Sequence, residues 1–172
     1  MSAGAVKETL GEVEVLRNQA RTTERVIQMN VEGITHKESL IQPEPAGNCL
    51  NWVVGHLTCV YNNVLPLLGQ NPVVQKNALN RYERGSAPIE NASDAVSLEE
   101  LLSMMSEAVK RFDAGVSTLT SEQLDAPSAF SPSNNPKETV RSLLATVLFH
   151  QAYHAGQTGT LRRLVGKKGA IA

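Results

Sequence analysis

The sequence has little of several features that mark particular classes of protein. Aromatic residues make up only 4% of its 172 residues, which leaves few rings for stacking on nucleic-acid bases. Sixteen Lys and Arg against seventeen Asp and Glu give a formal net charge of -1, so the basic footprint of nucleic-acid-binding proteins is absent. Cys49 and Cys59 are too few and too close for a disulfide framework, and they predict a reducing, cytoplasmic location.

Long hydrophobic runs are also absent. No apolar stretch approaches the roughly 18–20 residues that span a bilayer, so we expect no membrane segment. The first residues, MSAGAVKETLGEVEVL, become charged at once and carry no apolar core of a signal peptide. With 41% hydrophobic and 19% charged residues in 172, the composition predicts one globular domain spanning residues 1–172.

The sequence does contain hydrophobic spacing typical of helices. Four segments carry apolar side chains every three or four residues, and alternating, strand-like patterns are scarce. The prediction is therefore an all-α protein built as a four-helix bundle. The expected core-facing residues of the first two helices are Leu10, Val13, Leu16, Ala20, Thr23, Ile27 and Val31, then Cys49, Trp52, Val53, His56, Val60, Val64 and Leu67. Those of the last two are Leu98, Leu101, Met105, Ala108, Phe112 and Val116, then Val140, Leu143, Val147, His150, His154, Gln157 and Leu161.

Prolines and capping residues predict where these helices begin and end. Pro66 removes a backbone donor and should kink or end the second helix. Ser97, with Glu100 three residues later, predicts a capping box at the start of the third helix. Pro136 suits a first helical turn, so the fourth helix is expected to begin near it. Residues 70–96, between the second and third helices, are expected to form a long polar connection.

Three of the four histidines lie on predicted core-facing stripes. His150 and His154 are four residues apart, which places their rings on one face of a helix. A divalent metal can bridge such a pair, although two packed, hydrogen-bonded rings give the same pattern. His56 lies on the stripe of another helix, and burying three imidazoles without partners would be costly. A shared cation would supply that partner, so the sequence predicts a three-histidine metal site; His36 is expected at the surface.

The distribution of carboxylates excludes two metal chemistries. No Asp or Glu occurs from residue 48 to residue 69, and none follows Glu138. A di-iron bundle needs Glu-x-x-His pairs on its helices, so that class is excluded. Metalloproteases of the HExxH type are excluded as well, because residue 151 is Gln151. Any metal would be held by three neutral ligands, would keep its double positive charge, and would have coordination positions open.

Several residues near the histidines in sequence have more than one possible role. Cys59 could be a fourth, soft ligand or a small buried side chain. Gln157 could hydrogen-bond a ligand ring or a substrate, or could be a polar residue at the mouth of the bundle, and Asn63 has the same two readings. Tyr153 is expected in packing or at an interface. The basic residues expected at a solvated helix end, or beside an anionic substrate, are Arg162, Arg163, Lys167 and Lys168.

Two segments together resemble a known family. PEPAGNCLNWVVGHLTCVYNNVLPLLG and the closing HQAYHAGQTGTLRRLVG are similar to the corresponding helices of the DinB-like (damage-inducible B, YfiT-type) superfamily. The resemblance spans nearly the whole chain. It implies the four-helix bundle of that family, often a homodimer, with His56, His150 and His154 as a triad for zinc, nickel or manganese. It also implies a metal-dependent enzyme acting on a small molecule.

The resemblance leaves several functions open. Some relatives are transferases that use low-molecular-weight thiols such as bacillithiol or mycothiol, and others are metal-dependent isomerases or hydrolases. A non-catalytic metal-binding bundle with a stress-related or sensor role is the remaining alternative. If the protein is an enzyme, Glu12, Glu24 and Glu107 on the first and third helices are the candidate general bases, because the histidine-bearing helices carry no carboxylate.

Overall fold

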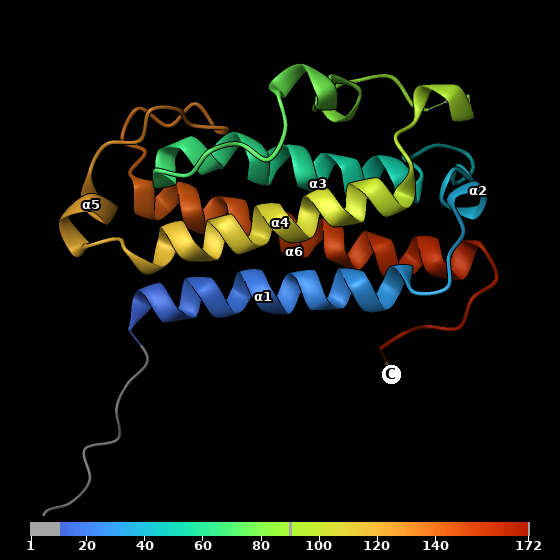
Figure 1. The fold of residues 1–172 in the computed structure, drawn as a ribbon, viewed down its shortest axis with the longest axis horizontal. Helices are drawn as coiled ribbons and strands as arrows, with labels where there is room; N and C mark the ends of the chain where they lie inside the picture. Colours follow the sequence, from blue (N-terminus) through green and yellow to red (C-terminus); the bar gives the residue numbers. More distant parts are fainter. Residues whose placement is uncertain (1–10, 90, 172) are drawn as a thin grey trace, which may run out of the picture.

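The computed structural model describes residues 11–89 and 91–171, and within these ranges the protein is helical with no strand. This confirms the predicted all-α class. None of the described helices is long and apolar enough to cross a membrane. The long helices are α1 (Glu12–Val31), α3 (Leu50–Val64), α4 (Leu98–Ser117) and α6 (Val140–Leu164) (Figure 1). The short ones are α2 (His36–Ser39), α5 (Ser121–Asp125) and the 3-10 helices η1 (Leu65–Leu68), η2 (Lys76–Tyr82) and η3 (Ala92–Asp94).

The four long helices pack as a bundle. Helices α1 and α3 do not adjoin; each packs against both α4 and α6. Helices α1 and α6 run in one direction along the bundle, and α3 and α4 run in the other (Figure 1). Because α3 and α4 are parallel neighbours, the chain between them must return along the length of the bundle. Residues 65–89 and 91–97 make that return, and they lie over the outside of α3.

Helices α1 and α4 are amphipathic, as their spacing predicts. Their buried side chains recur every three or four residues and join one hydrophobic core cluster. Val13 is only partly buried, and Leu10 lies outside the described residues. The buried residues of α1 are Leu16, Ala20, Thr23, Ile27, Asn30 and Val31, and those of α4 include Leu98, Leu101, Met105, Ala108, Phe112 and Val116.

Helix α3 is buried almost all round. Of its 15 residues, only Val60 and Asn63 are not fully buried, because α4, α6 and η2 enclose it on three sides. Its sequence contains no charged residue, which suits this position. Polar side chains therefore reach the interior on α3, and their hydrogen bonds must be made there.

The connection 70–96 differs from the polar loop predicted for it. It contains η2 and η3, and it contributes Leu79, Tyr82 and Ile89 to the buried core. Its apolar residues follow neither a helical nor a strand period, so the pattern gave no sign that this segment would be buried.

Polar side chains of α3 hold this connection in place. Asn62 accepts the backbone N–H of Val73 at 2.7 Å and donates to the carbonyl oxygen of Val74 at 3.1 Å. The hydroxyl of Tyr82 donates to Asn51 Oδ1 at 3.0 Å. The buried polar groups of α3 thus fix the position of the segment that covers it.

The helix boundaries agree only partly with the predictions. Pro66 does end the α-helical geometry, since α3 ends at Val64 and continues as η1. Ser97 accepts the N–H of Glu100 at 3.1 Å, but Glu100 does not return the bond, so Ser97 caps α4 without a capping box. Helix α6 begins at Val140, four residues later than predicted.

The later start of α6 has a local cause. Thr139 and Ser142 form a reciprocal capping box, with the Thr139 hydroxyl accepting the Ser142 N–H at 3.2 Å. This cap satisfies the first orphan donors of the helix. Pro136 lies in the turn that precedes it.

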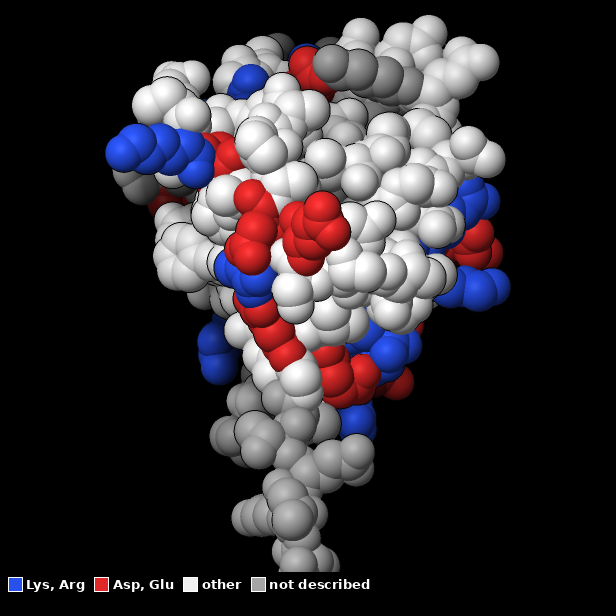
Figure 2. Space-filling view, turned by 90° about the vertical axis from the view of Figure 1, so that its left-hand side faces the viewer, with Lys and Arg blue, Asp and Glu red and all other residues white. Residues whose placement is uncertain are grey.

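One end of the bundle carries ion pairs. Figure 2 views the molecule from the end at which α5 lies, and acidic and basic side chains adjoin there. Arg141 pairs with Asp125 at 3.0 Å and also contacts Glu12, and Arg17 pairs with Asp113 at 2.8 Å. Opposite charges therefore neutralise one another locally on this face.

Candidate metal centre

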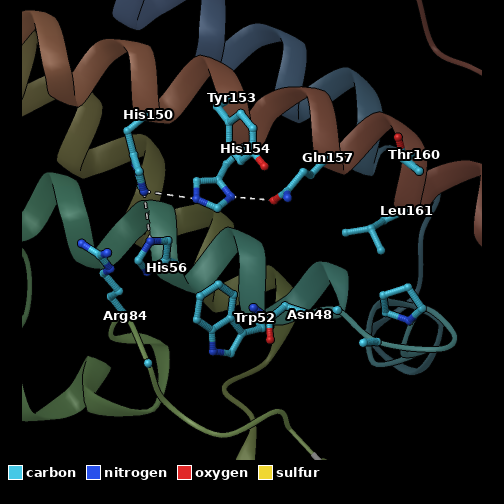
Figure 3. Close-up of a pocket in the computed structure, with 14 residues that line it drawn as sticks. Asn48, Trp52, His56, Arg84, His150, Tyr153, His154, Gln157, Thr160 and Leu161 are labelled. Carbon is cyan, nitrogen blue, oxygen red and sulfur yellow. Dashed lines mark hydrogen bonds between the residues drawn. The ribbon is translucent and has the colours of Figure 1, made fainter.

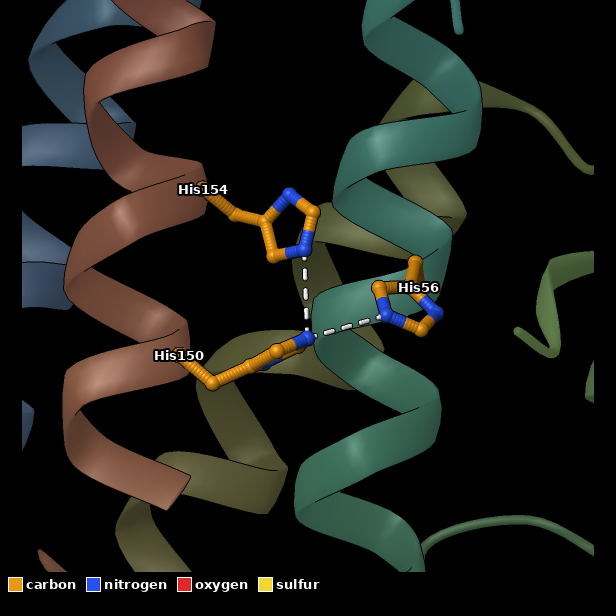
Figure 4. A group of neighbouring side chains, drawn as sticks. All are labelled: His56, His150 and His154. Atoms are coloured by element: carbon orange, nitrogen blue, oxygen red, sulfur yellow. Dashed lines mark hydrogen bonds between the residues drawn. The ribbon is translucent and has the colours of Figure 1, made fainter. Parts of the chain in front are cut away.

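Three histidines from two helices converge on one point. The Nε2 atom of His150 lies 3.2 Å from Nε2 of His56 and 3.1 Å from Nε2 of His154 (Figure 4). The three candidate ligand atoms all lie within 4.8 Å of one another. The structure thus brings together the three residues that the sequence predicted as a site.

The packing of α3 against α6 sets this arrangement. His150 and His154 are one turn apart on α6, and His56 faces them from the antiparallel neighbour α3 (Figure 4). Gln151 is fully buried, and its Nε2 donates to the carbonyl oxygen of Leu57 at 3.1 Å. This bond joins the residue after His150 to the residue after His56, so it fixes the relative height of the two helices at the site.

Two of the rings are oriented by carbonyl groups. His56 Nδ1 lies 2.7 Å from the backbone oxygen of Tyr82, and His154 Nδ1 lies 2.6 Å from Gln157 Oε1. A carbonyl oxygen can only accept, so both Nδ1 atoms carry the proton and donate it. The Nε2 lone pairs of His56 and His154 are then directed towards His150. This is how metal-binding histidines are commonly held.

The donor set fits a divalent cation. At least two lone pairs meet at the centre of the group, and His150 Nδ1 is buried without a hydrogen-bond partner. A tetrahedral ion with bonds of about 2.0–2.1 Å holds its nitrogen ligands roughly 3.3 Å apart, close to the observed 3.1 and 3.2 Å. The residues present could therefore hold such an ion with little rearrangement.

Burial keeps these rings neutral. It lowers the pKa of His150 to about 4, and the neighbouring His154, His56 and Arg84 contribute to the shift. Burial is also the main cause that lowers the pKa of His56, with smaller effects from His154 and Arg84. The pKa of His154 is lowered by burial, against its hydrogen bond to Gln157. Neutral imidazole is the form that binds a metal.

The histidines open into a cavity of about 670 Å³ between α3, α6 and the segments around residues 43–48 and 84–85 (Figure 3). The ring of Trp52 stacks on His56 with a centroid separation of 4.7 Å, and its Nε1–H donates to Ser86 Oγ at 2.9 Å. No Asp or Glu among the residues that the structure describes lines the cavity. Its lining also includes Asn48, Arg84, Tyr153, Gln157, Thr160 and Leu161.

The contacts of Cys59, Gln157 and Tyr153 help to decide between the roles predicted for them. Cys59 is buried, accepts the side-chain amide of Asn63 at 3.5 Å, and does not belong to the group of candidate ligand atoms. Gln157 hydrogen-bonds the ring of His154, one of the three candidate ligands. Tyr153 is 60% exposed and its ring meets His154 edge-on at 5.3 Å.

His36 is placed differently from its prediction. It was expected at the surface, but it is half-buried, and its Nδ1 accepts the N–H of Leu98 at 3.2 Å. It therefore satisfies a donor at the first turn of α4. It takes no part in the histidine group.

The three carboxylates considered as general bases lie elsewhere. Glu24 and Glu107 line a groove between α1 and α4, where Glu24 accepts the Ser106 hydroxyl at 2.6 Å. Glu12 contacts Arg141 at the end of the bundle. None of the three lines the histidine cavity.

The basic end of α6 is structural. Arg162 donates to the carbonyl oxygens of Asn30 and Glu32, at 3.1 and 2.6 Å. Lys167 pairs with Glu38 at 3.2 Å. Neither residue lines the histidine cavity.

Two residues of the site could not be predicted from the sequence pattern. Tyr82 orients His56 through its main chain, and a backbone contact leaves no mark in the sequence. Arg84 lies beside the histidines although it is 28 residues after His56 in the sequence, in a segment predicted as a loop (Figure 3). The stacking of Trp52 on His56 could be predicted from the sequence, because a spacing of four residues places both rings on one helix face.

Comparison with known proteins identifies the family. None of the curated proteins compared with this chain matches it. The crystal structure of a conserved protein from Enterococcus faecalis matches with a TM-score of 0.72 and 17% sequence identity, covering 92% of this chain and 100% of that one. At this identity the likeness shows a shared fold. The sequence matches the DinB superfamily over residues 17–158, a span that holds all three histidines, and the chain therefore belongs to that superfamily.

Proposed function

We propose that this protein is a divalent-metal-dependent enzyme that acts on a small molecule, with His56, His150 and His154 as the metal ligands. The observation that carries the proposal is the convergence of three histidine Nε2 atoms at the wall of an open cavity. Structural zinc sites are normally closed by four protein ligands, whereas catalytic sites have three and keep a position open.

The residues around the histidines have distinct roles in this proposal. The Tyr82 carbonyl and Gln157 hold two of the rings with Nε2 facing inward. Trp52 covers one face of His56 and shields it from water. A cation held by three neutral rings would act as a Lewis acid and lower the pKa of a bound water or thiol. With no carboxylate in the cavity lining, the described side chains supply no acidic general base there.

Zinc or nickel suits the donor set better than manganese. Three imidazoles are typical ligands for zinc and nickel, while manganese favours carboxylate and carbonyl oxygen. We therefore expect purified protein to contain or take up zinc or nickel first.

The reaction we propose is the transfer of a low-molecular-weight thiol to a small electrophilic acceptor. The thiol sulfur forms the new bond to the acceptor carbon, the bond from that carbon to its leaving group breaks with its electron pair going to the leaving group, and the thiol proton leaves to solvent. A cavity of about 670 Å³ has room for both reactants. Hydrolysis or isomerisation of a small molecule is the alternative within the same metal site. A non-catalytic metal site is disfavoured because Cys59 is not among the converging ligands.

The first test is metal binding. Metal-stripped protein is titrated with zinc, nickel and manganese, and bound metal is measured by elemental analysis after dialysis. We expect one ion per chain in the wild type and its loss in His56→Ala, His150→Ala and His154→Ala. His36→Ala is the matched control, because it removes the one histidine outside the group. Equal metal content in all five proteins would refute the site.

The second test is turnover. Metal-loaded protein is screened with thiols and electrophilic acceptors, and consumption of free thiol is followed. We expect turnover that depends on metal. We expect His150→Ala to lose this turnover while its helical circular dichroism is retained. Turnover with water or by rearrangement of the acceptor, without thiol, would replace transfer by the hydrolase or isomerase alternative.

A further inference from the structure

A second cavity meets the first at the histidines. It measures about 230 Å³ and shares His56, Arg84 and His150 with the larger cavity. These three side chains therefore form a wall with a cavity on either side. The rest of the second cavity is mostly apolar, lined by Val60, Val64, Phe130, Pro132 and Val147.

The second cavity is large enough for an apolar group of a ligand. A cavity of about 150 Å³ with apolar walls binds benzene, so 230 Å³ accepts a phenyl ring or a short branched alkyl chain. Phe130, on the segment before α6, is 44% exposed although it faces this cavity. An apolar ligand group placed here would remove part of that ring from water.

The shared wall carries a positive charge that no described residue neutralises. Within residues 11–89 and 91–171, Arg84 forms no ion pair and no Asp or Glu lines either cavity. Its side chain reaches towards His56 from the loop after η2 (Figure 3). Arg84 lines both cavities together with His56 and His150, so its guanidinium charge lies beside these two rings. A metal at the histidines would add further positive charge to the same wall.

We propose that the site takes a small amphipathic anion. The anionic group is held between Arg84 and the metal at the shared wall, and the apolar group occupies the 230 Å³ cavity. A guanidinium pairs with a carboxylate or phosphate through two parallel hydrogen bonds. The larger cavity stays free for a second reactant. This inference rests on the proposed metal site and names the substrate class for it.

Three small molecules test separately how the anionic group and the apolar group of a ligand contribute to binding. 3-Phenylpropanoate carries both, 3-phenylpropan-1-ol lacks the charge, and acetate lacks the apolar group. Their dissociation constants are measured by calorimetry on metal-loaded and metal-free protein. We expect 3-phenylpropanoate to bind at least about tenfold more tightly than either of the others, since each lacks one of the two contacts.

Two variants assign the contacts. Arg84→Gln should raise the dissociation constant of 3-phenylpropanoate by about tenfold to a hundredfold and leave that of the alcohol unchanged. Arg25→Gln, an exposed arginine on α1 that lines neither cavity, is the charge-matched control. Thr146→Phe starts from an exposed residue on the wall of the small cavity and should fill it. It should bring the affinity for 3-phenylpropanoate down to that for acetate, which itself should not change.

The outcomes separate this inference from the metal site. Metal content is measured first on every variant, and its absence from the wild type would refute the metal site itself. With metal bound, equal affinity for the acid and the alcohol would overturn the role of Arg84. Equal affinity for 3-phenylpropanoate and acetate, or no effect of Thr146→Phe, would overturn the apolar subsite. Undetectable binding of 3-phenylpropanoate to metal-loaded protein would overturn the whole inference.

Discussion

Two histidine rings at the site are oriented by different kinds of carbonyl group. His56 donates to the main chain of Tyr82, and His154 donates to the side chain of Gln157. The first contact survives any substitution that preserves the backbone, whereas the second can be removed with one mutation. Gln157 is therefore the residue at which the orientation of a ring can be tested alone.

We expect Gln157→Ala to weaken metal binding by about 10–100-fold while the fold is kept. The ring of His154 would lose the acceptor that fixes its Nδ1 proton and hence the direction of Nε2. Competition with a chelator of known affinity measures the change, and circular dichroism checks the fold. Gln28→Ala, at an exposed position on α1, is the control. An unchanged metal affinity in Gln157→Ala would mean that the packing of α6 alone orients the ring.

Gln151 lies between the two histidines of α6 in sequence but points away from the cavity. Its substitution Gln151→Glu would complete the HExxH pattern of metalloproteases. The side chain is fully buried and donates to Leu57, so a carboxylate there would lose that bond and sit uncompensated in the core. We expect a loss of about 3 kcal/mol in the free energy of unfolding and no protease activity.

The pH dependence of this variant has a definite sign. Burial raises the pKa of a carboxyl group in the folded state above its unfolded value of about 4.3. The loss in the free energy of unfolding relative to wild type is then largest at neutral pH and becomes smaller as pH falls towards about 4. Urea titrations of both proteins across this range check it. A loss that does not change with pH would point to misfit of shape rather than buried charge.

The contact between α3 and the 70–96 connection is close at one glycine. A methyl group at Gly55 would lie 2.2 Å from Cδ1 of Tyr82, whose main chain holds His56. Because Tyr82 is fully buried, the ring cannot move away freely. The same contact that packs the connection on α3 therefore also sets the position of His56, a candidate metal ligand.

We expect Gly55→Ala to destabilise the protein by about 1–3 kcal/mol through overpacking, and to weaken metal binding. Gly156→Ala is the matched control, because Gly156 is an exposed glycine within α6 and an added methyl group would meet nothing within 4 Å. That change should stabilise by about 0.5–1 kcal/mol. Thermal melts with and without metal measure both effects. Comparable stability of the two variants would contradict the close packing of Tyr82.

At the scale of the whole molecule, the buried histidines make stability depend on pH. The pKa values of His56, His150 and His154 are all lowered in the folded state, His150 to about 4. In the unfolded chain each titrates near 6.5. Below that pH the unfolded chain binds protons that the folded chain does not, so stability is full above about 6.5 and falls as pH drops towards 4.

For metal-free protein we therefore expect the free energy of unfolding to fall between about pH 7.5 and about pH 5.5. The slope should approach about 1.4 kcal/mol per pH unit for each proton taken up only by the unfolded chain. Denaturant titrations in the presence of a chelator provide the measurement. A variant with all three histidines replaced by Gln should lose most of this slope, and an unchanged slope would assign it to other groups.

The outer face of α6 is where we expect the interface of the predicted homodimer to lie. Phe149 is 74% exposed and Tyr153 is 60% exposed, one turn apart and next to a shallow groove between α1 and α6. Exposed large apolar side chains of this kind mark interaction surfaces. We expect a dimer by light scattering and a monomer for Phe149→Glu. Leu164→Glu, at 45% exposure near the end of α6, should remain dimeric. A wild type that is monomeric at every concentration tested would refute this prediction.

The sequence by itself determined the fold class and the histidine candidates. Helical periodicity places apolar side chains on one face of α1 and α4, and the same spacing puts His150 and His154 on one face of α6. Such patterns are local, since they follow from the 3.6-residue period of a helix, and a single sequence is enough to read them. The absence of carboxylates near the histidines is equally local, and it excluded di-iron and HExxH chemistry before any contact was known.

Only the tertiary structure decided how the site is completed. The Tyr82 carbonyl reaches His56 because α3 and α4 run parallel and the intervening chain must return over α3. Arg84 enters the shared wall of the two cavities by the same return. Contacts of this kind join segments far apart in sequence and depend on packing and backbone hydrogen bonds, neither of which follows a period. The helices could therefore be predicted from residue types, while the groups that orient the ligands and charge the cavity required the fold.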